Sequence, residues 1–587
     1  MPMACQTLTQ ALEKLILSLC LESYPCGQGS WRKPSLREHE DLDDAALEDQ
    51  FILLELLRSP QSPWQEKGSW SPQALALREL AVKTPGILKG NFKHTFFTSL
   101  RIVDMGVSVI DEGLLKFSCL EELVLSANHI TQLLSENLPK TLLVLELYSN
   151  QISSLKSLKT HPPPPHLQHL GLGNNCLGSP EDIQYFTAEH WPQLKSLDLS
   201  WCGFTELYHV VEALSALPCL QSLVLVGNPL TLASSYPGIV LDSLPRLLYL
   251  DGARVTPEDR HQFRGFSQLK GTVFEEAEVT VCVQKIKGVP KPALSLEEFP
   301  VVSYSYSASY EFLDQPQSQE NTNVESHILT NIHQNPPHQR EGSASILCPG
   351  ADFLKTSWEH HNKGLNIPVV MNSTQKQEWA EVMEFNFMRT NRFSDLTVLK
   401  NFFLRGLWLT VEEEKVVSWP APPAEIGGTK ASADKKGKES TDQNSKDKKK
   451  KKETVINLIH EAPVKQTLGS VHVELKNLME GKHQIQVDCN LGTLHSEESV
   501  RTTVTREKEQ SKKPIENKKT KPSGDTASAQ RNLTPSKGKG RARKENETDP
   551  RADDNFNSIT EPLTVEFSVQ LSKVLCASQL SNQTTMK

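Results

Sequence analysis

The sequence predicts an α/β solenoid of about seven coils with a helical N-terminal cap, followed by a discontinuous, mainly-β sandwich-like domain with disordered insertions. Three observations lead to this prediction. A leucine pattern recurs from about residue 97 to residue 252, the residues before it show helical spacing, and short runs of alternating apolar residues follow it. A repeat of this length indicates a solenoid, because each repeat buries its apolar face only against its neighbours.

The repeated pattern is L-x-x-L-x-L-x-x-N-x-I, and its plainest copies begin at Leu120 and Leu142. Three further copies keep the same spacing, a degenerate copy precedes them, and a truncated copy closes the series. The copies begin at residues 97, 120, 142, 167, 194, 220 and 247, so the period is 22 to 27 residues. This is the signature of leucine-rich repeats, which form a horseshoe.

Each copy is expected to place one short strand in a parallel sheet, with its leucines pointing into a shared core. The ninth position carries an amide that can bond backbone groups where the chain leaves the strand, which makes its burial tolerable. These residues are Asn128, Asn150, Asn175 and Asn228, with Cys202 in the same position of one copy. We expect structural roles for all five.

The chain has 587 residues, a formal net charge of -8 and eleven cysteines. The length predicts several domains, and the cysteines form no C-x-x-C pair, as expected in a reducing compartment. No apolar run approaches the length of a membrane span. The leucine-rich start is interrupted by Glu13 and Lys14, so it indicates an amphipathic helix rather than a signal peptide. We expect a cytoplasmic protein without a membrane partner.

Residues 1–95 are expected to form a helical region that caps the open end of the solenoid, which occupies residues 96–270 with its own C-terminal cap. An independent interaction helix is the alternative for the N-terminal region. Within the array, Ser179 followed by Pro180 and two acidic residues predicts the start of a helix. Apolar residues at helical spacing predict another helix between residues 204 and 217.

Beyond the array, residues 271–420 and 453–493 contain apolar residues that alternate with polar ones and are expected to supply strands. A last strand in residues 559–587 is expected to complete this β domain. The segments between are rich in polar and charged residues and are expected to be disordered. They are residues 314–350, the lysine-rich linker 421–452, and residues 494–558.

The array ends at Leu244–Gly252, and Thr256-Pro257-Glu258-Asp259 follows as the start of a helix that shields the last coil. At these residues the chain resembles the C-terminal cap of short cytoplasmic leucine-rich repeat proteins. That family includes a protein phosphatase regulator, a spliceosomal snRNP protein, an axonemal dynein light chain and dynein-assembly factors. The resemblance covers residues 97–265 and implies protein partners, such as axonemal or dynein-assembly components, in the cytoplasm or in motile cilia.

Side chains that alternate with the leucines are expected to line the concave face of the horseshoe. The candidate protein-binding residues there are Arg101, Glu146, Tyr148, Asp198 and Trp201. Tyr148 and Trp201 are aromatics of the kind found at interface hot spots, although Trp201 could equally fold over a neighbouring coil as packing. Glu146 and Asp198 make the strip mildly acidic and favour a basic partner segment.

The sharpest charge run contains Lys448, Lys449, Lys450, Lys451 and Lys452. Blocks of like charge usually lie in solvated linkers, which is one interpretation. Nuclear import and contact with an acidic surface such as a tubulin tail are the functional alternatives. No aromatic residues are interleaved with the lysines, so nucleic-acid binding by base stacking is not expected.

The sequence contains no phosphate-binding loop, nucleophile elbow, zinc-protease or dinucleotide-binding motif in a suitable context, so no enzymatic activity and no cofactor are expected. The histidines at 161, 166 and 169 lack the further ligands of a metal site. Two functions stand: a cytoplasmic or ciliary adaptor, and a nuclear RNP scaffold. Phosphatase regulation is a third, suggested by fold analogy alone. The oligomeric state is not set by the sequence.

Overall fold

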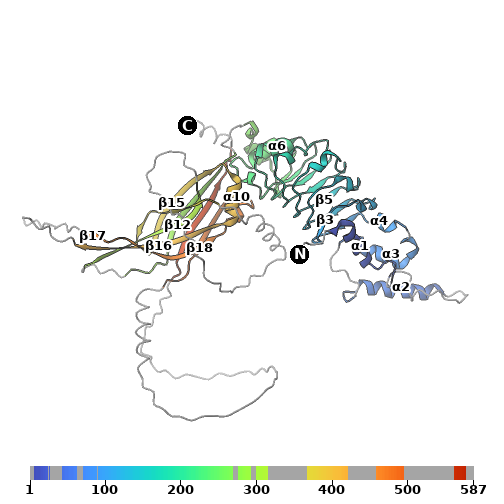
Figure 1. Ribbon diagram of the computed structural model, residues 1–587, viewed down its shortest axis with the longest axis horizontal. Helices are drawn as coiled ribbons and strands as arrows, with labels where there is room; N and C mark the ends of the chain where they lie inside the picture. The colour runs from blue at the N-terminus through green and yellow to red at the C-terminus, as the bar shows by residue number, and fades with distance from the viewer. Residues whose placement is uncertain are drawn as a thin grey trace, which may run out of the picture.

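The computed structural model describes residues 6–23, 26, 42–62, 70–88, 90–268, 275–292, 299–314, 367–420, 458–494 and 561–576. Figure 1 shows an arc of short strands in the first half of the chain and, beside the later end of the arc, a body of two antiparallel sheets. The insertions that the sequence predicts to be disordered, 314–350, 421–452 and 494–558, fall almost entirely outside the described residues.

The N-terminal elements lie at the start of the arc. The Thr7 side chain accepts a hydrogen bond from Gln10 N, and the Gln10 side chain accepts one from Thr7 N, so a capping box begins the first helix. The carbonyl of Trp70 accepts a hydrogen bond from Arg101 N (2.7 Å) and so engages the edge of the first array strand. The elements are β1 (Gln6–Thr7), α1 (Leu8–Ser18), α2 (Leu42–Arg58), α3 (Ala74–Lys83), η2 (Pro85–Leu88) and α4 (Phe92–Thr95).

The array strands run parallel in one sheet and follow one another in chain order. β10 pairs antiparallel with the last of them, and β3 (Val107–Val109) pairs with β1 outside this sheet. The central leucine of each strand is in register with that of the next strand and is buried, so the leucines stack through the core. The strands are β2 (Ser99–Arg101), β4 (Glu122–Val124), β5 (Val144–Glu146), β6 (His169–Gly171), β7 (Ser196–Asp198), β8 (Ser222–Val224), β9 (Tyr249–Leu250) and β10 (Ala253–Arg254).

The amide at the ninth repeat position bonds across two coils, which confirms its structural role. Asn150 Oδ1 accepts from Ile130 N (3.1 Å), while Nδ2 donates to the carbonyls of Leu125 and Leu147 (both 3.0 Å). Cys202 is buried in the same position of another coil, and its thiol donates to a carbonyl of the preceding coil (3.2 Å). Equivalent amide bonds are made by Asn128, Asn175 and Asn228.

Short helices on the convex side connect the array strands and follow the last of them. The start predicted at Ser179 is confirmed, because its side chain accepts from Glu181 N (3.3 Å) and Pro180 is the first helical residue. The helix of the C-terminal cap begins after Thr256, which forms a capping box with Asp259. The elements are η3 (Glu112–Lys116), η4 (Ser135–Asn137), η5 (Lys156–Lys159), α5 (Pro180–Ile183), α6 (Leu207–Ser215), η6 (Pro229–Leu232), α7 (Gly238–Ser243), α8 (Pro257–Gln262) and η7 (Phe266–Gln268).

The C-terminal body has one sheet of order β15-β11-β20-β19 and another of order β13-β12-β16-β17, with β14 beside β12 and β18 beside β16. The most C-terminal of the described strands, β20, lies inside its sheet between β11 and β19. The elements are β11 (Ala277–Lys287), β12 (Val301–Leu313), β13 (Val369–Ser373), β14 (Gln377–Glu378), β15 (Val382–Phe393), α10 (Leu396–Arg405), β16 (Leu407–Pro420), β17 (Leu458–His460), β18 (Val464–Val473), η9 (Lys476–Leu478), β19 (Gln484–Asn490) and β20 (Thr564–Ser572).

Aromatic side chains join the two sheets. The ring of Tyr310 on β12 lies 6.1 Å from that of Phe567 and 6.2 Å from that of Phe387, both on the other sheet. The neighbouring Phe312 packs edge-on against Phe402 of α10 at 5.0 Å. These rings are large apolar groups in contact geometries that aromatic pairs favour, so they anchor both sheets and α10 in one core.

The two-sheet body bonds directly to the last coils of the array. Gly227 N donates to the carbonyl of Met479 (3.1 Å). Ser234 N donates to Glu276 O, and Val574 N donates to Ser234 O (both 2.9 Å). Backbone groups of three separate segments of the C-terminal body therefore meet the last part of the array.

Lys573, just after β20, completes this contact. Its amino group donates to the carbonyls of Thr231 (2.7 Å) and Ala233 (2.8 Å) and lies 5.7 Å from the centre of the Tyr236 ring. Burial lowers the pKa of Lys573 to about 7. The array and the C-terminal body are thus joined through a buried amino group that donates to two carbonyls and lies beside an aromatic ring.

We predict that Asn150→Ala lowers the free energy of unfolding by about 2–4 kcal/mol, because three buried backbone groups lose their partner. Chemical denaturation monitored by circular dichroism measures this loss. The exposed neighbour supplies the control, since Gln151→Ala removes a similar amide from the surface and should change stability by less than about 0.5 kcal/mol. Equal losses in the two variants would contradict the amide ladder.

We also predict that the protein becomes less stable as the pH falls from 10.5 to about 7. The pKa of Lys573 in the folded chain lies below its usual value of 10.5, so in this window the unfolded chain binds a proton that the folded chain does not. Thermal unfolding at several pH values measures the slope. Lys573→Met should reduce the slope, leaving the part that Lys400 contributes above about pH 8, whereas the exposed Lys465→Met should leave it unchanged.

Candidate protein-binding interface

The concave face contains glycines over which side chains of the preceding coil lie. A β-carbon at Gly171 would approach the Glu146 carboxylate to 2.1 Å, and one at Gly173 would approach Tyr148 Cδ2 to 2.8 Å. Because these positions lack a β-carbon, the Glu146 and Tyr148 side chains lie across β6 toward β7. The glycines therefore bring groups from three neighbouring strands into one cluster.

A carboxylate, an imidazole and a hydroxyl line up across β5, β6 and β7. Glu146 Oε2 lies 3.1 Å from His169 Nε2, and His169 Nδ1 lies 3.0 Å from Ser196 Oγ. In this order the carboxylate, the imidazole and the hydroxyl resemble the acid, the base and the nucleophile of a catalytic triad. However, Ser196 N donates to the Gln168 carbonyl (2.9 Å) in the sheet and is not free to stabilise an oxyanion. The three groups form a row of close polar contacts on the concave face.

Asp198 adds a second carboxylate to this cluster. Its Oδ1 accepts a hydrogen bond from Ser200 N (2.8 Å), yet burial raises the pKa of Asp198, and Glu146 raises it further. Burial likewise raises the pKa of Tyr148, with Asp198 as the next cause. The cluster thus contains two half-buried carboxylates and one imidazole, that of His169, which contacts Glu146. We call Glu146, Tyr148, His169 and Asp198 the acidic cluster.

Arg101 does not join the acidic cluster. It lies on β2, separated from β5 by β4, and its guanidinium binds Glu122 Oε1 at 2.7 Å. The same Glu122 side chain accepts from Ser99 Oγ (2.9 Å). Of the five residues predicted from the sequence, the structure brings together Glu146, Tyr148 and Asp198.

Trp201 is half-buried and is covered by the chain itself. Its backbone is left-handed (φ 57°), and a β-carbon at Gly227 in the next coil would approach the indole to 2.2 Å. On the other side, Lys400 Nζ of α10 lies 5.5 Å from the ring centre. Burial lowers the pKa of Lys400 to about 8. These contacts favour the interpretation of Trp201 as packing and leave it poorly placed as an exposed hot spot.

The sequence-based prediction did not include helix α10 or its Lys400, which covers Trp201. Asp395 caps α10 by accepting from Thr397 N and Val398 N (both 3.0 Å), and Gly406 ends it with φ 76°. A capping aspartate, apolar residues at helical spacing and a terminal glycine are the usual signals of a helix. The lysines at 448–452 lie outside the described residues, so the prediction for them stays a prediction.

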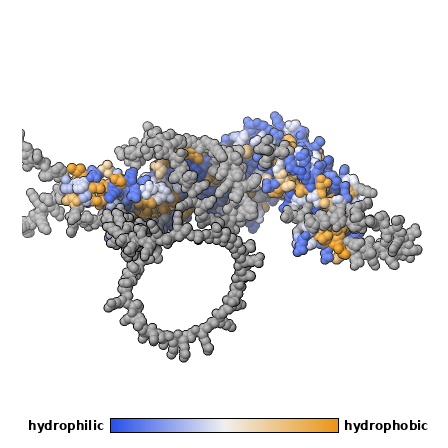
Figure 2. All heavy atoms as spheres, turned by 60° about the horizontal axis from the view of Figure 1, so that its bottom comes forward, coloured by the Kyte–Doolittle hydropathy of each residue, from blue (hydrophilic) through white to orange (hydrophobic). Residues whose placement is uncertain are grey.

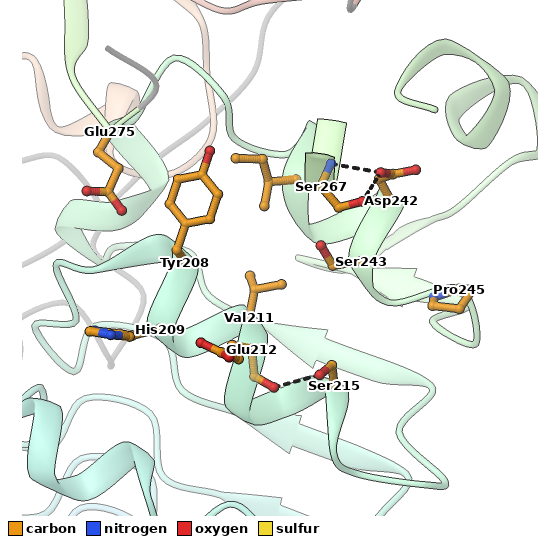
Figure 3. A pocket seen from close by; sticks show the side chains of 11 residues that line it. Tyr208, His209, Val211, Glu212, Ser215, Asp242, Ser243, Pro245, Ser267 and Glu275 are labelled. Atoms are coloured by element: carbon orange, nitrogen blue, oxygen red, sulfur yellow. Dashed lines mark hydrogen bonds between the residues drawn. The ribbon is translucent and has the colours of Figure 1, made fainter. Parts of the chain in front are cut away.

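A pocket lies between α6 and α7 on the convex side of the array (Figure 3). Its volume is about 840 Å³. Tyr208 and Glu275 stand on one side of it, and Asp242 stands on the other. Asp242 accepts from Ser267 Oγ (2.5 Å), Ser267 N (2.8 Å) and Gly265 N (3.2 Å), and these bonds lower its pKa despite partial burial. This carboxylate therefore holds η7 against α7, which is a structural task.

Two negative findings apply to the described residues. None of their helices combines the length and apolar character required to cross a membrane. They also contain no group of three or more histidine, cysteine, aspartate or glutamate residues arranged to hold a metal ion.

Residues 15–89 match the sequence family described as the leucine-rich repeat-containing protein 43 N-terminal domain, and residues 366–583 match the corresponding C-terminal domain. Leucine-rich repeat-containing protein 43 of Homo sapiens is 34% identical over 597 residues, covering 88% of this chain and 90% of that protein. The chain belongs to the leucine-rich repeat-containing protein 43 family. The Mus musculus member is 32% identical over 620 residues, covering 88% of this chain and 91% of that protein.

Two solved structures show weaker likeness to this family member. The Drosophila melanogaster SNF/U2A′ complex has a chain with a TM-score of 0.20 and 21% identity, covering 29% of this chain and 82% of that chain. A structure titled "CC2D1B coordinates ESRCT-III activity during the mitotic reformation of the nuclear envelope" has a TM-score of 0.18 and 8% identity. The match covers 52% of this chain and 59% of that chain. Both TM-scores are low, so the fold assignment depends on the repeats and the strand order.

We predict that Trp201→Ala lowers the melting temperature by several degrees, because the indole fills the space between Gly227 and Lys400. Differential scanning fluorimetry measures the change. Trp408→Ala is the matched control, since Trp408 is 49% exposed and should be replaced with little loss. If Trp201→Ala left the melting temperature unchanged and abolished binding of a partner, Trp201 would be an interface residue and not part of the packing.

Proposed function

We propose that this member of the leucine-rich repeat-containing protein 43 family is a non-enzymatic scaffold that binds a basic protein segment on the concave face of a seven-coil horseshoe. In this proposal the two sheets of the C-terminal body form one sandwich-like domain, which stays attached to the last coils. Arg101 lies at one end of the strip and Trp201 at the other, where α10 adjoins it. The bound segment therefore runs over the acidic cluster between them.

The acidic cluster is the observation that supports this function best. Glu146 and Asp198 are half-buried carboxylates with one imidazole to balance them, and the raised pKa of Asp198 reflects that environment. A lysine or arginine side chain placed between them would gain charge-assisted hydrogen bonds. The face of Tyr148 beside them offers a cation–π contact to the same group.

The setting of this scaffold is proposed from the resemblance of the C-terminal cap to axonemal and dynein-assembly proteins. This resemblance supports a location in the cytoplasm or in motile cilia, with axonemal or dynein-assembly components as partners. A nuclear RNP scaffold and a phosphatase-regulatory scaffold are the alternatives. They differ from the ciliary proposal in the proteins found next to the chain in cells.

We predict that the double variant Glu146→Gln, Asp198→Asn loses most of its partners, because neutral amides keep the shape but remove the charge that attracts a basic segment. Proximity labelling of the full-length protein in multiciliated cells measures this loss. Glu258→Gln, an exposed acid in the C-terminal cap, is the control and should retain the wild-type partners. Unchanged labelling in the double variant would refute the acidic cluster as the binding site.

The same experiment with Lys448 to Lys452 replaced by glutamine tests the location. We expect dynein, radial-spoke or tubulin components next to both the wild type and this variant. Nuclear labelling that disappears in the glutamine variant would favour the RNP scaffold instead.

A further inference from the structure

An apolar arm projects from the C-terminal body at the end opposite the array. We define the arm as residues 301–304 of β12, residues 415–420 of β16, and β17. Figure 1 shows β17 at the far tip of this projection, and Figure 2 shows hydrophobic surface at the same end of the molecule. The arm is distinct from the concave face, so its function is a separate question.

One face of the arm carries a stripe of apolar side chains. Val302 lies opposite Val417, and Trp419 lies opposite Ile459, so these four side chains share one face of the sheet. Trp419 is 44% exposed and Ile459 is 54% exposed. The indole is held in place because Trp419 Nε1 donates to Glu461 Oε1 (2.6 Å). Apolar groups fixed on a projecting surface are typical of an interaction site.

The strand edges of the arm are open within the described part of the chain. Residues 301–304 of β12 pair with β16 on one side, and the strands on the other side of β12 begin at Ser305. Among the described strands, β17 pairs only with β16. Residues 301–304 and 458–460 contain no lysine, aspartate or glutamate, which are residues that usually prevent another strand from pairing; the Glu461 that follows β17 accepts the Trp419 hydrogen bond. No strand in the described part of the chain pairs with these edges, so their backbone groups could pair with an added strand.

The open edges decide between two kinds of partner. A bilayer core offers no hydrogen bonds, so inserting unpaired backbone groups into it costs several kcal/mol for each group. An extended protein segment satisfies the same groups by strand addition and places alternate side chains on the apolar stripe. The backbone therefore favours a protein strand over a lipid surface.

The sequence next to the arm indicates which charge the partner strand should carry. Thirty-seven residues connect Pro420 to Leu458, and they contain ten lysines and six acidic residues. Both ends of this basic segment are covalently joined to residues of the arm, Pro420 and Leu458, so its net positive charge favours a partner strand that carries acidic residues. We propose that the arm binds an extended protein segment in which apolar residues alternate with acidic ones, and that it does so by adding that segment to a strand edge.

The test uses the full-length protein and a fluorescent peptide of twelve alternating valine and glutamate residues. Fluorescence anisotropy should show binding, and Trp419→Ser and Ile459→Ser should each weaken it at least about tenfold, as expected for hot-spot side chains. Trp408→Ser is the matched control, because Trp408 lies on the same strand with its ring against His472, 5.3 Å away, and should bind like the wild type. A peptide with lysine in place of glutamate should not bind.

Other outcomes would overturn the proposal. They are no binding of the acidic peptide, equal binding by the Trp419→Ser variant, and equal binding of the lysine peptide. Capture of phosphatidylserine vesicles that depends on Trp419 would assign the arm to a membrane surface. A dimer that both arm substitutions dissociate would assign it to a second copy of the chain. The double variant Glu146→Gln, Asp198→Asn should bind the peptide normally, so failure of the concave-face proposal is distinguishable from failure of this one.

Discussion

The hydrogen bonds of four buried amides support the array on which the rest of the structure depends. Asn128, Asn150, Asn175 and Asn228 each satisfy backbone groups of their own coil and of a neighbouring coil. Unpaired groups at these depths would offset much of the gain from burying the leucines. Since the amides fix where the chain leaves each strand, they also set the register in which concave side chains stand beside one another.

The array could be predicted from sequence because its signal is repeated. A leucine or asparagine at a fixed spacing recurs in each coil, so a single weak copy does not change the interpretation. Helix starts at Ser179 and Thr256 were equally readable, because local side chain–backbone bonds determine them. In the C-terminal body, alternation located most of the strands. It could not give their order, in which β20 lies between β11 and β19, because pairing across nearly 300 residues leaves no local trace.

The candidate site was predicted less completely, and Trp201 shows why. Its position on the concave strip followed from the repeat, but its cover comes from Lys400, which lies 199 positions later in the chain. α10 has ordinary helix signals, yet nothing in those signals states which surface it packs against. Gly171 and Gly173 were visible in the sequence as small residues. That they let Glu146 and Tyr148 lean toward β7 becomes evident only when neighbouring coils are stacked.

The contact between Lys573 and the carbonyls of Thr231 and Ala233 spans more than 300 residues of the chain. During synthesis on the ribosome, the array can assemble while its last coil still lacks this partner, because Lys573 is synthesised 342 residues after Thr231 and 340 residues after Ala233. The sheet that contains β11 is likewise incomplete until β20, its interior strand, has been synthesised. A premature stop codon anywhere before residue 564 would therefore leave a formed horseshoe joined to an incomplete sheet, with apolar strand faces exposed to chaperones and proteases.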